Sequence, residues 1–384
     1  MKIKEKNILI LVSSLGGGGA ERVACRLASE LSKRHNIYLW YEMHKEQEYY
    51  TVPEVHKLFC PTWPGLKPMR AKLKKIKEDG HKEDRHNIGS IARSGIELLK
   101  NLYRYYGIFY KVVMVTVIRF KYHIDTTISF LTYPNLINVL AWGNNRKIVS
   151  ERNDPSRQNR YYQKRAAFAQ RKADFVVFQS KKVQKMYSED MQEKSCIIPN
   201  PIEVSCFVSE YKTKKVVTAG RLNKQKNHRM LIEAFALFHT LHPDYHLYIY
   251  GVGNLWEALH QATDYYGIKE YVHFEGFKED IHAAIADAEM FVLSSDYEGL
   301  PNALMEAMTM GHACISTACT GADELIVDEK TGLLVPVGDA AALSGAMCRL
   351  SDNPELRERL GKAAAIAAQE WATERVARLW ERIL

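Results

Sequence analysis

Two glutamates, Glu298 and Glu306, stand at the two ends of the segment 298–306. Their type and spacing are the first sign of a functional site in this chain. The run before them, 290–295, is apolar enough for a buried strand, and the residues after it continue with helical periodicity. Ligands of parallel α/β sheets bind at the carboxyl ends of strands, where free N–H groups of a helix start attract an anion. We therefore expect a diphosphate at the helix start, one carboxylate binding hydroxyls of a sugar ring and the other those of a ribose. The first residues between the carboxylates are Gly299, Leu300, Pro301 and Asn302.

Two cations follow the predicted strand 215–220. Arg221 and Lys226 lie in the turn between that strand and the helical stretch 230–238. An arginine can donate to two phosphate oxygens at once, and a lysine supplies a compact positive charge. A pyrophosphate is the ligand that suits such a pair.

A glycine-rich loop, 16–19, follows the first predicted strand and precedes Glu21, Arg22 and a helical run. Glycines allow a sharp turn and close approach of a ligand to the backbone, so we expect this loop to face a phosphate. Counting G-x-G-x-x-G from its first two glycines ends on Glu21 or Arg22, and no GK[ST] follows. Neither the dinucleotide fingerprint nor the P-loop is present, which argues against a nicotinamide dehydrogenase.

Polar residues also follow the predicted strand 147–150, in the sequence Ser-Glu-Arg-Asn-Asp-Pro. They would lie at the carboxyl end of a strand in the first half of the chain, where a second substrate can bind. A plain Asx-turn is the alternative interpretation. The candidate acceptor-side residues are Glu21, Arg22, Glu151, Arg152, Asn153 and Asp154.

Short apolar runs alternate with longer segments of helical period, which is the pattern of βαβ units around parallel sheets. We expect strands at 7–14, 36–41, 126–131, 147–150, 174–179, 215–220, 246–251, 272–276, 290–295 and 313–317. Two prolines in the segment 198–204 favour extended backbone, and we expect the hinge there. The predicted fold class is α/β with two Rossmann-like domains, 1–202 and 203–364, and a helix at 365–384 that crosses back to the first.

Composition places the chain among ordinary globular proteins, with 46% hydrophobic and 26% charged residues. Its seven cysteines are scattered, without a CxxC pair, so we expect free thiols in a reducing compartment and a cytoplasmic protein. No run is long and apolar enough to span a membrane. The net charge is +8, and the basic, aromatic segment 67–121 suits either a solvated helix face or an anionic membrane surface.

The Glu-Gly-x-Pro-x4-Glu run at 298–306 resembles the paired-glutamate signature of glycosyltransferase family 4, the retaining GT-B enzymes. The accompanying segments stand in that family's order: Gly-Gly-Ala-Glu-Arg at 18–22, Gly-Arg-x4-Lys-Asn at 220–227, the loop with Gly251 and Gly253, and Phe-Glu-Gly-Phe at 274–277. The resemblance covers essentially the whole chain and is strongest from 215 to 335. It implies two Rossmann-like domains with parallel sheets facing a central cleft.

The resemblance also implies roles for individual residues. Arg221 and Lys226 would neutralise the donor diphosphate, Glu298 would hold the transferred sugar, and Glu306 would bind ribose hydroxyls. The backbone near Phe277 would meet the base, and Gly18 and Gly19 would let the first domain close onto the diphosphate. Family members resemble one another in needing no divalent metal or other cofactor, and the sequence has no Asp-x-Asp metal motif.

The expected reaction moves a hexose or N-acetylhexosamine from a nucleotide-sugar, by preference a UDP-sugar, to a glycan or polyprenyl-diphosphate-linked acceptor. We expect no nucleic-acid partner. Two alternatives remain open at this point. A GT-B nucleotide-sugar epimerase would convert the donor without an acceptor, and a non-catalytic binding protein would retain the donor intact.

Overall fold

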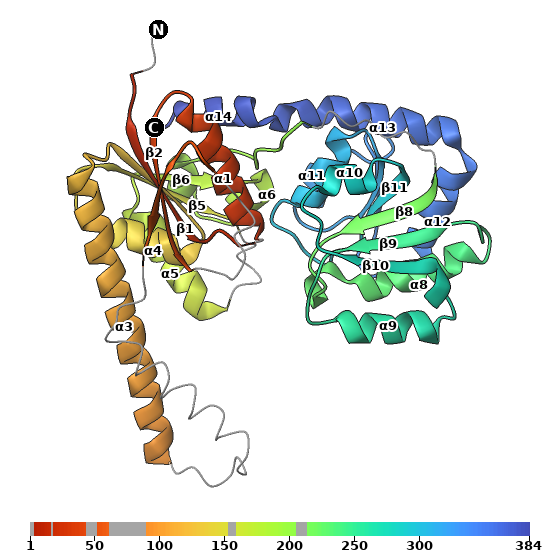
Figure 1. Ribbon diagram of the computed structural model, residues 1–384, viewed down its shortest axis with the longest axis horizontal. Coiled ribbons are helices and arrows are strands. Elements are labelled where there is room, and N and C mark those ends of the chain that lie inside the picture. Colours follow the sequence, from red (N-terminus) through yellow and green to blue (C-terminus); the bar gives the residue numbers. More distant parts are fainter. Residues whose placement is uncertain (1–3, 17, 44–51, 61–89, 153–158, 205–212) are drawn as a thin grey trace. The chain divides into compact units, whose positions relative to one another are not determined.

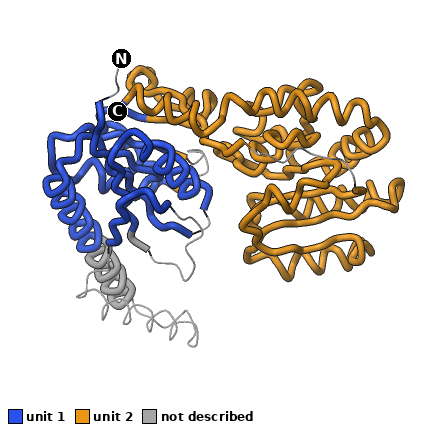
Figure 2. Tube along the Cα trace, turned by 45° about the horizontal axis from the view of Figure 1, so that its top comes forward, with its two compact units in different colours: residues 1–151, 160–176, 384 blue, residues 152–159, 177–383 orange. Residues whose placement is uncertain are grey.

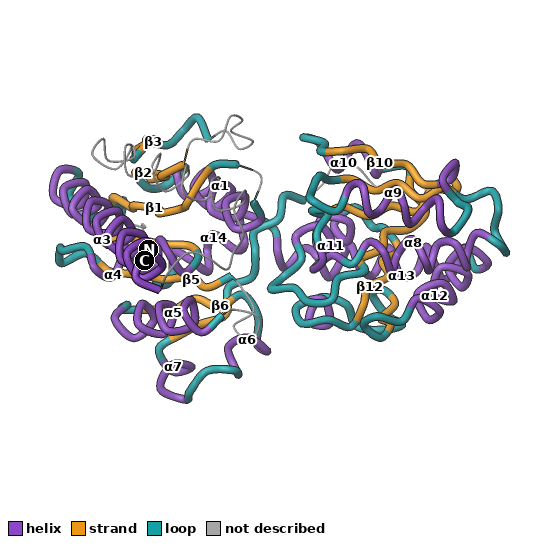
Figure 3. Tube along the Cα trace, turned by 90° about the horizontal axis from the view of Figure 1, so that it is seen from below, coloured by secondary structure: helices purple, strands orange, loops and turns teal. Residues whose placement is uncertain are grey.

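The computed structural model describes residues 4–16, 18–43, 52–60, 90–152, 159–204 and 213–384, with the side chains of 42–43 and 90–104 not described. It contains two parallel β-sheets, whose strand orders are β3-β2-β1-β4-β5-β6-β7 and β10-β9-β8-β11-β12-β13 (Figure 1). Helices flank the strands of both sheets (Figure 3). The α/β class with two Rossmann-like sheets is therefore confirmed.

The strands of the first sheet are β1 (Asn7–Ser14), β2 (Asn36–Met43), β3 (His56–Phe59), β4 (Thr126–Phe130), β5 (Arg146–Glu151), β6 (Phe175–Phe178) and β7 (Ser195–Ile197). The helices of this half are α1 (Gly19–Ser32), α3 (Ser90–Lys121), α4 (Thr132–Leu140), α5 (Arg160–Lys172), α6 (Lys181–Lys185) and α7 (Glu189–Glu193). Strand β1 pairs in parallel with β2 and β4, so the Gly-rich loop leaves the centre of the sheet.

The strands of the second sheet are β8 (Thr213–Ala219), β9 (His246–Tyr250), β10 (Val272–Gly276), β11 (Ala288–Leu293), β12 (Ala313–Thr317) and β13 (Leu333–Val335). The α-helices of this half of the chain are α8 (His228–His239), α9 (Trp256–Tyr265), α10 (Ile281–Ile285), α11 (Asn302–Thr309), α12 (Ala340–Asp352), α13 (Pro354–Ala368) and α14 (Thr373–Glu381). The 3₁₀ turns are η3 (Lys224–Lys226), η4 (Lys269–Tyr271), η5 (Ala322–Glu324) and η6 (Gln369–Trp371).

Alternation along the strands of the second sheet divides its apolar side chains between two cores. Val216, Met290 and Val292 belong to one core, which α8, α9 and α12 complete. Val217 and Phe291 belong to the other core, with residues of α11 and α13. Burial on both faces is what a parallel sheet with helices on both sides requires. In the first sheet, α3 and α4 cover the face that carries Leu9, Leu11 and Trp40.

Contacts divide the chain into two compact units, residues 1–151, 160–176 and 384 in one, and 152–159 and 177–383 in the other (Figure 2). Residues 177–197 thus fall in the second unit although β7 belongs to the first sheet. The domain limits expected at 202 and 364 and the crossing helix stay predictions. No helix among the described residues meets the length and hydropathy needed to cross a membrane. The six cysteines that the structure describes are free thiols.

Candidate functional site

Glu298 lies in a network of donors at the carboxyl end of the second sheet. Lys226 Nζ is 2.6 Å from Glu298 Oε1, and Ser295 Oγ donates to the same oxygen at 2.6 Å. Gln225 Nε2 donates to Glu298 Oε2 at 3.2 Å and to the carbonyl of Tyr297 at 3.0 Å. Both carboxylate oxygens of Glu298 are therefore held by hydrogen bonds. Glu298, expected to bind the sugar, and Lys226, expected to bind the diphosphate, are in direct contact.

The turn that carries Lys226 is shaped by two asparagines. Asn223 Oδ1 accepts from the Lys226 N–H at 3.1 Å, closing the 3₁₀ turn η3. Asn227 has left-handed backbone, φ 44°, which asparagine tolerates better than most residues, and its side chain caps α8. Its amide also donates to Asp296 Oδ1 at 2.7 Å, joining the turn to the segment before Glu298.

His228, the first residue of α8, is buried beside this turn. Burial, together with the nearby charge of Lys226, lowers the pKa of its imidazole to about 3. The ring is therefore neutral at physiological pH and adds no positive charge to the site.

Two glycines let neighbouring loops approach the backbone around Arg221. A Cβ on Gly251, which has φ +139°, would lie 1.9 Å from the carbonyl oxygen of Gly220. A Cβ on Gly253 would lie 2.2 Å from the carbonyl oxygen of Leu222. Both glycines are thus required for packing, whatever they do for a ligand. Arg221 itself is exposed, and Phe277, after the end of β10, is 41% exposed.

The segment after β11 enters α11 as the sequence predicted. Glu298 precedes the helix and Glu306 lies on it, buried at 2% exposure. Pro301 is the N-cap with extended backbone, and the helix begins at Asn302, within the predicted helix start. A Cβ on Gly321 would lie 2.2 Å from the carbonyl oxygen of Gly299, so the loop after β12 packs directly on this segment.

Arg152, expected on the acceptor side, lies against the same segment. A Cβ on Gly299 would meet the Arg152 carbonyl oxygen at 2.5 Å and Gln179 Nε2 at 2.0 Å. Asn200 donates to the Leu300 carbonyl at 3.2 Å and accepts from Arg152 Nη1 at 2.6 Å. All these residues belong to the second unit.

Gly18, Gly19, Glu21, Arg22 and Glu151 lie in the first unit. Gly18 is the N-cap of α1, and a Cβ there would lie 2.0 Å from the Glu21 carboxylate, which folds over the helix start. Arg22 donates its N–H to the Gly18 carbonyl at 3.0 Å. Gly19 is the first residue of α1. The Glu21 carboxylate lies in the first turn of α1, where a negative charge interacts favourably with the helix dipole.

Glu151 ends β5 with 1% exposure and accepts from Thr132 Oγ1 at 3.2 Å. The neighbouring Leu131 has φ 72°, a strained value for a residue with a Cβ, at the carboxyl end of β4. No sequence pattern pointed to Leu131 or Thr132 as site residues. Asn153 and Asp154 lie outside the described residues.

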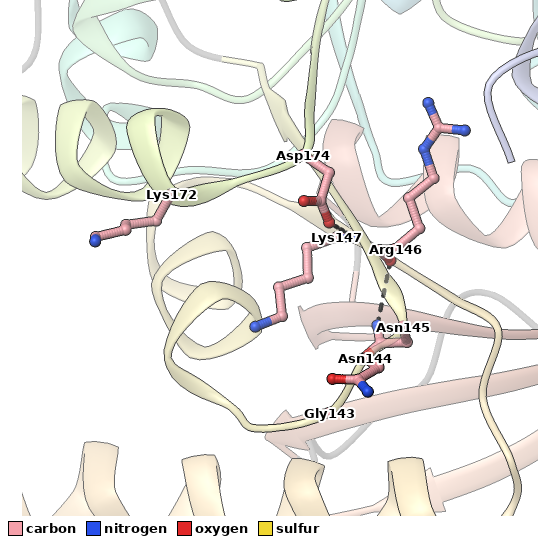
Figure 4. Close-up of a pocket in the computed structure, with 7 residues that line it drawn as sticks. All are labelled: Gly143, Asn144, Asn145, Arg146, Lys147, Lys172 and Asp174. Atoms are coloured by element: carbon pink, nitrogen blue, oxygen red, sulfur yellow. Dashed lines mark hydrogen bonds between the residues drawn. The ribbon is translucent and has the colours of Figure 1, made fainter.

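An open pocket of about 650 Å³ lies elsewhere in the first unit, lined by Gly143, Asn144, Asn145, Arg146, Lys147, Lys172 and Asp174. Asp174 accepts from the Lys147 N–H at 2.7 Å, and the side chains of Arg146 and Lys147 point in opposite directions (Figure 4). Arg146 begins β5, so the pocket is at the amino end of that strand, whereas Glu151 is at its carboxyl end. It contains none of the predicted site residues.

Sequence reasoning missed three residues that shape the site: Gln225, Ser295 and Asn200. Gln225 and Ser295 stand within the segments it singled out, one before Lys226 and three before Glu298, but nothing in their type distinguished them. Asn200 lies in the predicted hinge, and its partners are 48 and 102 residues away. A single sequence carries no signal for contacts at that separation.

Comparison with known proteins shows which proteins the residues around this site resemble. Residues 207–366 match the family model described as Glycosyl transferases group 1. The matched stretch contains Arg221, Lys226, Glu298 and Glu306. The chain is 27% identical over 395 aligned positions, 96% of each chain, to N-acetylgalactosamine-N,N'-diacetylbacillosaminyl-diphospho-undecaprenol 4-alpha-N-acetylgalactosaminyltransferase of Campylobacter jejuni. It is 33% identical over 42% of each chain to the putative glycosyltransferase EpsD of Bacillus subtilis.

Solved structures agree on the fold. HepE of Anabaena, in complex with UDP and glucose, covers 99% of both chains with a TM-score of 0.76 at 16% identity. Sucrose-phosphate synthase of Thermosynechococcus elongatus covers 99% of this chain and 98% of its own with a TM-score of 0.79 at 15% identity. Residues 207–366 thus match the group 1 glycosyl transferases, and the chain is a glycosyltransferase with the GT-B fold.

Proposed function

We propose that this glycosyltransferase moves a hexose or N-acetylhexosamine from a UDP-sugar to a glycan or polyprenyl-diphosphate-linked acceptor, with retention of configuration. The observation that carries the proposal is the Lys226–Glu298 pair, 2.6 Å apart, directly before α11. The name of the Campylobacter relative describes transfer of N-acetylgalactosamine to a diphospho-undecaprenol glycan. HepE has been solved with UDP and glucose, which supports a UDP-linked donor.

In this proposal Lys226 and Arg221 neutralise the diphosphate, and the N–H groups in the first turn of α11 add partial positive charge. Glu298 accepts hydrogen bonds from sugar hydroxyls, and Glu306 accepts them from the ribose. Charge that develops on the leaving UDP is stabilised by groups already in place, which is the largest contribution that a fixed site makes to rate.

The bond between the sugar C1 and the diphosphate oxygen breaks, while a bond forms between C1 and the acceptor oxygen on the same face. The proton of the acceptor hydroxyl moves to an oxygen of the departing phosphate. No protein side chain needs to serve as base in this step, and none is assigned. Independence from divalent metal is part of the proposal, because the cations named above supply the positive charge.

The acceptor partner that we propose is presented at an anionic membrane surface, with the protein in the cytoplasm. Helix α3 bears aromatic and aliphatic side chains that are each more than half exposed: Tyr105, Tyr106, Phe109, Val117 and Phe120. Trp142, 66% exposed, lies beside this helix, because its N–H donates to Thr116 Oγ1 at 3.1 Å. Exposed aromatic residues together with Lys121 and a net charge of +8 suit anionic headgroups.

A vesicle flotation experiment tests the membrane part. The protein should float with vesicles containing phosphatidylglycerol and not with pure phosphatidylcholine, and the double substitution Phe109→Ser, Phe120→Ser should abolish flotation. Equal recovery with both lipids, or none with either, would contradict the proposal.

A donor screen tests the reaction. Purified protein is incubated with UDP-glucose, UDP-galactose, UDP-GlcNAc, UDP-GalNAc or GDP-mannose, with and without an undecaprenyl-diphosphate-linked sugar and with and without EDTA. Release of UDP from one donor that depends on the acceptor and resists EDTA is the expected result. Loss of activity in EDTA would refute metal independence, and conversion of a donor without acceptor would favour an epimerase.

A further inference from the structure

The amide of Asn200 connects two parts of the second unit. It is 4% exposed. Its Nδ2 donates to Asn302 Oδ1 at 2.5 Å and to the Leu300 carbonyl oxygen at 3.2 Å. Its Oδ1 accepts from Arg152 Nη1 at 2.6 Å. One side chain therefore joins Arg152 to the first residue of α11.

Gln179 holds the other side of the same segment. It is 3% exposed, and its Nε2 donates to the Arg152 carbonyl oxygen at 3.0 Å. The space where Gly299 would carry a Cβ is filled by this amide and by that carbonyl oxygen, at 2.0 and 2.5 Å. Arg152, Gln179 and Asn200 thus form one buried polar cluster, called the amide cluster below, that packs against residues 299–302.

Residues 298–301 lie between β11 and α11, outside both elements, and only the N-cap Pro301 takes part in the helix, where its carbonyl accepts from the Met305 N–H at 3.1 Å. Their conformation depends on side chains from elsewhere, since buried carbonyl and amide groups need partners. The amide cluster supplies these partners at Leu300 and Asn302. Removal of one amide leaves a buried acceptor without its donor, which is unfavourable, so the segment loses a contact that stabilises this conformation.

We propose that Asn200, together with Gln179 and Arg152, is a positioning residue of the donor site, which sets the conformation of the segment 299–302 for binding the diphosphate. The inference rests on the proposed function, because it assumes that the start of α11 binds the donor. It assigns Arg152 to the donor side, where the sequence had placed it with the acceptor. It also gives the predicted hinge segment a direct task in donor binding.

The substitution Asn200→Asp separates the two halves of this bridge. An aspartate still accepts from Arg152, but it has no N–H to donate to Leu300 or Asn302. A matched control exists in the first unit, where Asn138 is fully buried, accepts from Arg119 Nη2 at 2.5 Å and donates to the Ser129 hydroxyl at 2.9 Å. Asn138→Asp makes the same chemical change away from the donor segment.

Isothermal titration with UDP is the first readout, and steady-state kinetics with the donor found in the screen is the second. Asn200→Asp should raise the Kd for UDP about tenfold or more, and raise the donor KM by a larger factor than it lowers kcat. Asn138→Asp should lower the melting temperature and leave the Kd and KM at wild-type values. A residue that only stabilised the fold would lower the active fraction and leave KM unchanged.

A second variant allows the inference to be tested even if Asn200→Asp does not fold. Asn302→Ala removes the acceptor of the Asn200 amide at the start of α11 and should also raise the Kd for UDP. Wild-type UDP affinity in a folded Asn200→Asp or in Asn302→Ala would overturn the inference. If the wild-type protein itself bound no UDP, the proposed donor would be wrong, and this outcome is distinct from the first.

Discussion

Lys226 and Glu298, 72 residues apart in the sequence, form an ion pair of 2.6 Å whose side chains are only 16% and 8% exposed. Lys226 is also the cation that we propose for the donor diphosphate, so a bound donor would share the lysine with the carboxylate or replace the carboxylate as its partner. Ser295 and Gln225 keep Glu298 hydrogen-bonded while this happens. In the proposed function, the pair would hold both side chains in place before a ligand binds.

Loss of the lysine charge should impair both catalysis and folding. Lys226→Ala leaves Glu298 buried without its cation, a change that is strongly destabilising in buried pairs. We expect kcat to fall about 10²- to 10³-fold, the effect of removing one stabilising group from a transition state, and the melting temperature to fall as well. The control is Lys224→Ala, because Lys224 is an exposed lysine of the same turn. This variant should match the wild type in both kcat and melting temperature. Wild-type kcat in Lys226→Ala would remove this lysine from the mechanism.

The hydroxyl of Ser295 should matter through Glu298. In Ser295→Ala the carboxylate loses a 2.6 Å donor but keeps Lys226, so we expect kcat/KM to fall about tenfold with little change in UDP affinity. Ser316→Ala is a matched control, because Ser316 is equally buried and donates to the Thr317 carbonyl at 2.9 Å. Kinetics and UDP titration of both variants decide the matter. Equal kinetic effects of the two substitutions would show that Ser295 acts only through general packing.

Gly251 should tolerate no side chain. In Gly251→Ala the new Cβ would lie 1.9 Å from the Gly220 carbonyl oxygen, on backbone with φ +139°, and displace the Arg221 loop. We expect a lower melting temperature and weaker UDP binding. Gly345→Ala, in α12 with nothing within 4 Å of the added Cβ, should instead raise stability by about 0.5–1 kcal/mol. A Gly251→Ala protein with wild-type melting temperature and UDP affinity would contradict the packing described for these loops.

Buried histidines should make the protein less stable in acid. Burial lowers the pKa of His312 from 6.5 to about 4, so the unfolded chain binds a proton before the folded one does. This contribution is complete above pH 6.5 and is lost as pH falls from 6.5 towards 4, by about 1.4 kcal/mol per pH unit. His312→Gln should flatten the pH dependence of the unfolding free energy, measured by urea titration from pH 7 to 5. His56→Gln, at an exposed position, is the control; an unchanged slope in His312→Gln would refute the assignment.

Most of the fold was predictable because its strands are buried apolar runs. The expected bounds 7–14, 272–276 and 313–317 are those of β1, β10 and β12. Strand β3 was missed because its four residues are mostly exposed and carry no apolar run. The three-residue strands β7 and β13 are too short for a periodic signal.

The candidate site was predictable where chemistry and local sequence coincide. Glu298, Lys226 and the helix start followed from charge and from the strand-to-helix pattern. Asn200 could not be predicted in this way, because its two flanking prolines indicate only an extended backbone. Its contacts are with Arg152 and Asn302, which are distant in sequence. Long-range hydrogen bonds of this kind are set by tertiary structure.

The most direct test of glycosyl transfer is mass spectrometry of the lipid-linked acceptor after incubation with wild-type protein and the five donors. We predict that the acceptor gains one sugar residue from a single UDP-sugar, that the product retains the donor's anomeric configuration by NMR, and that Glu298→Gln gives little product. An acceptor whose mass never changes, while the protein still binds UDP or interconverts the donor, would contradict the assignment of this reaction.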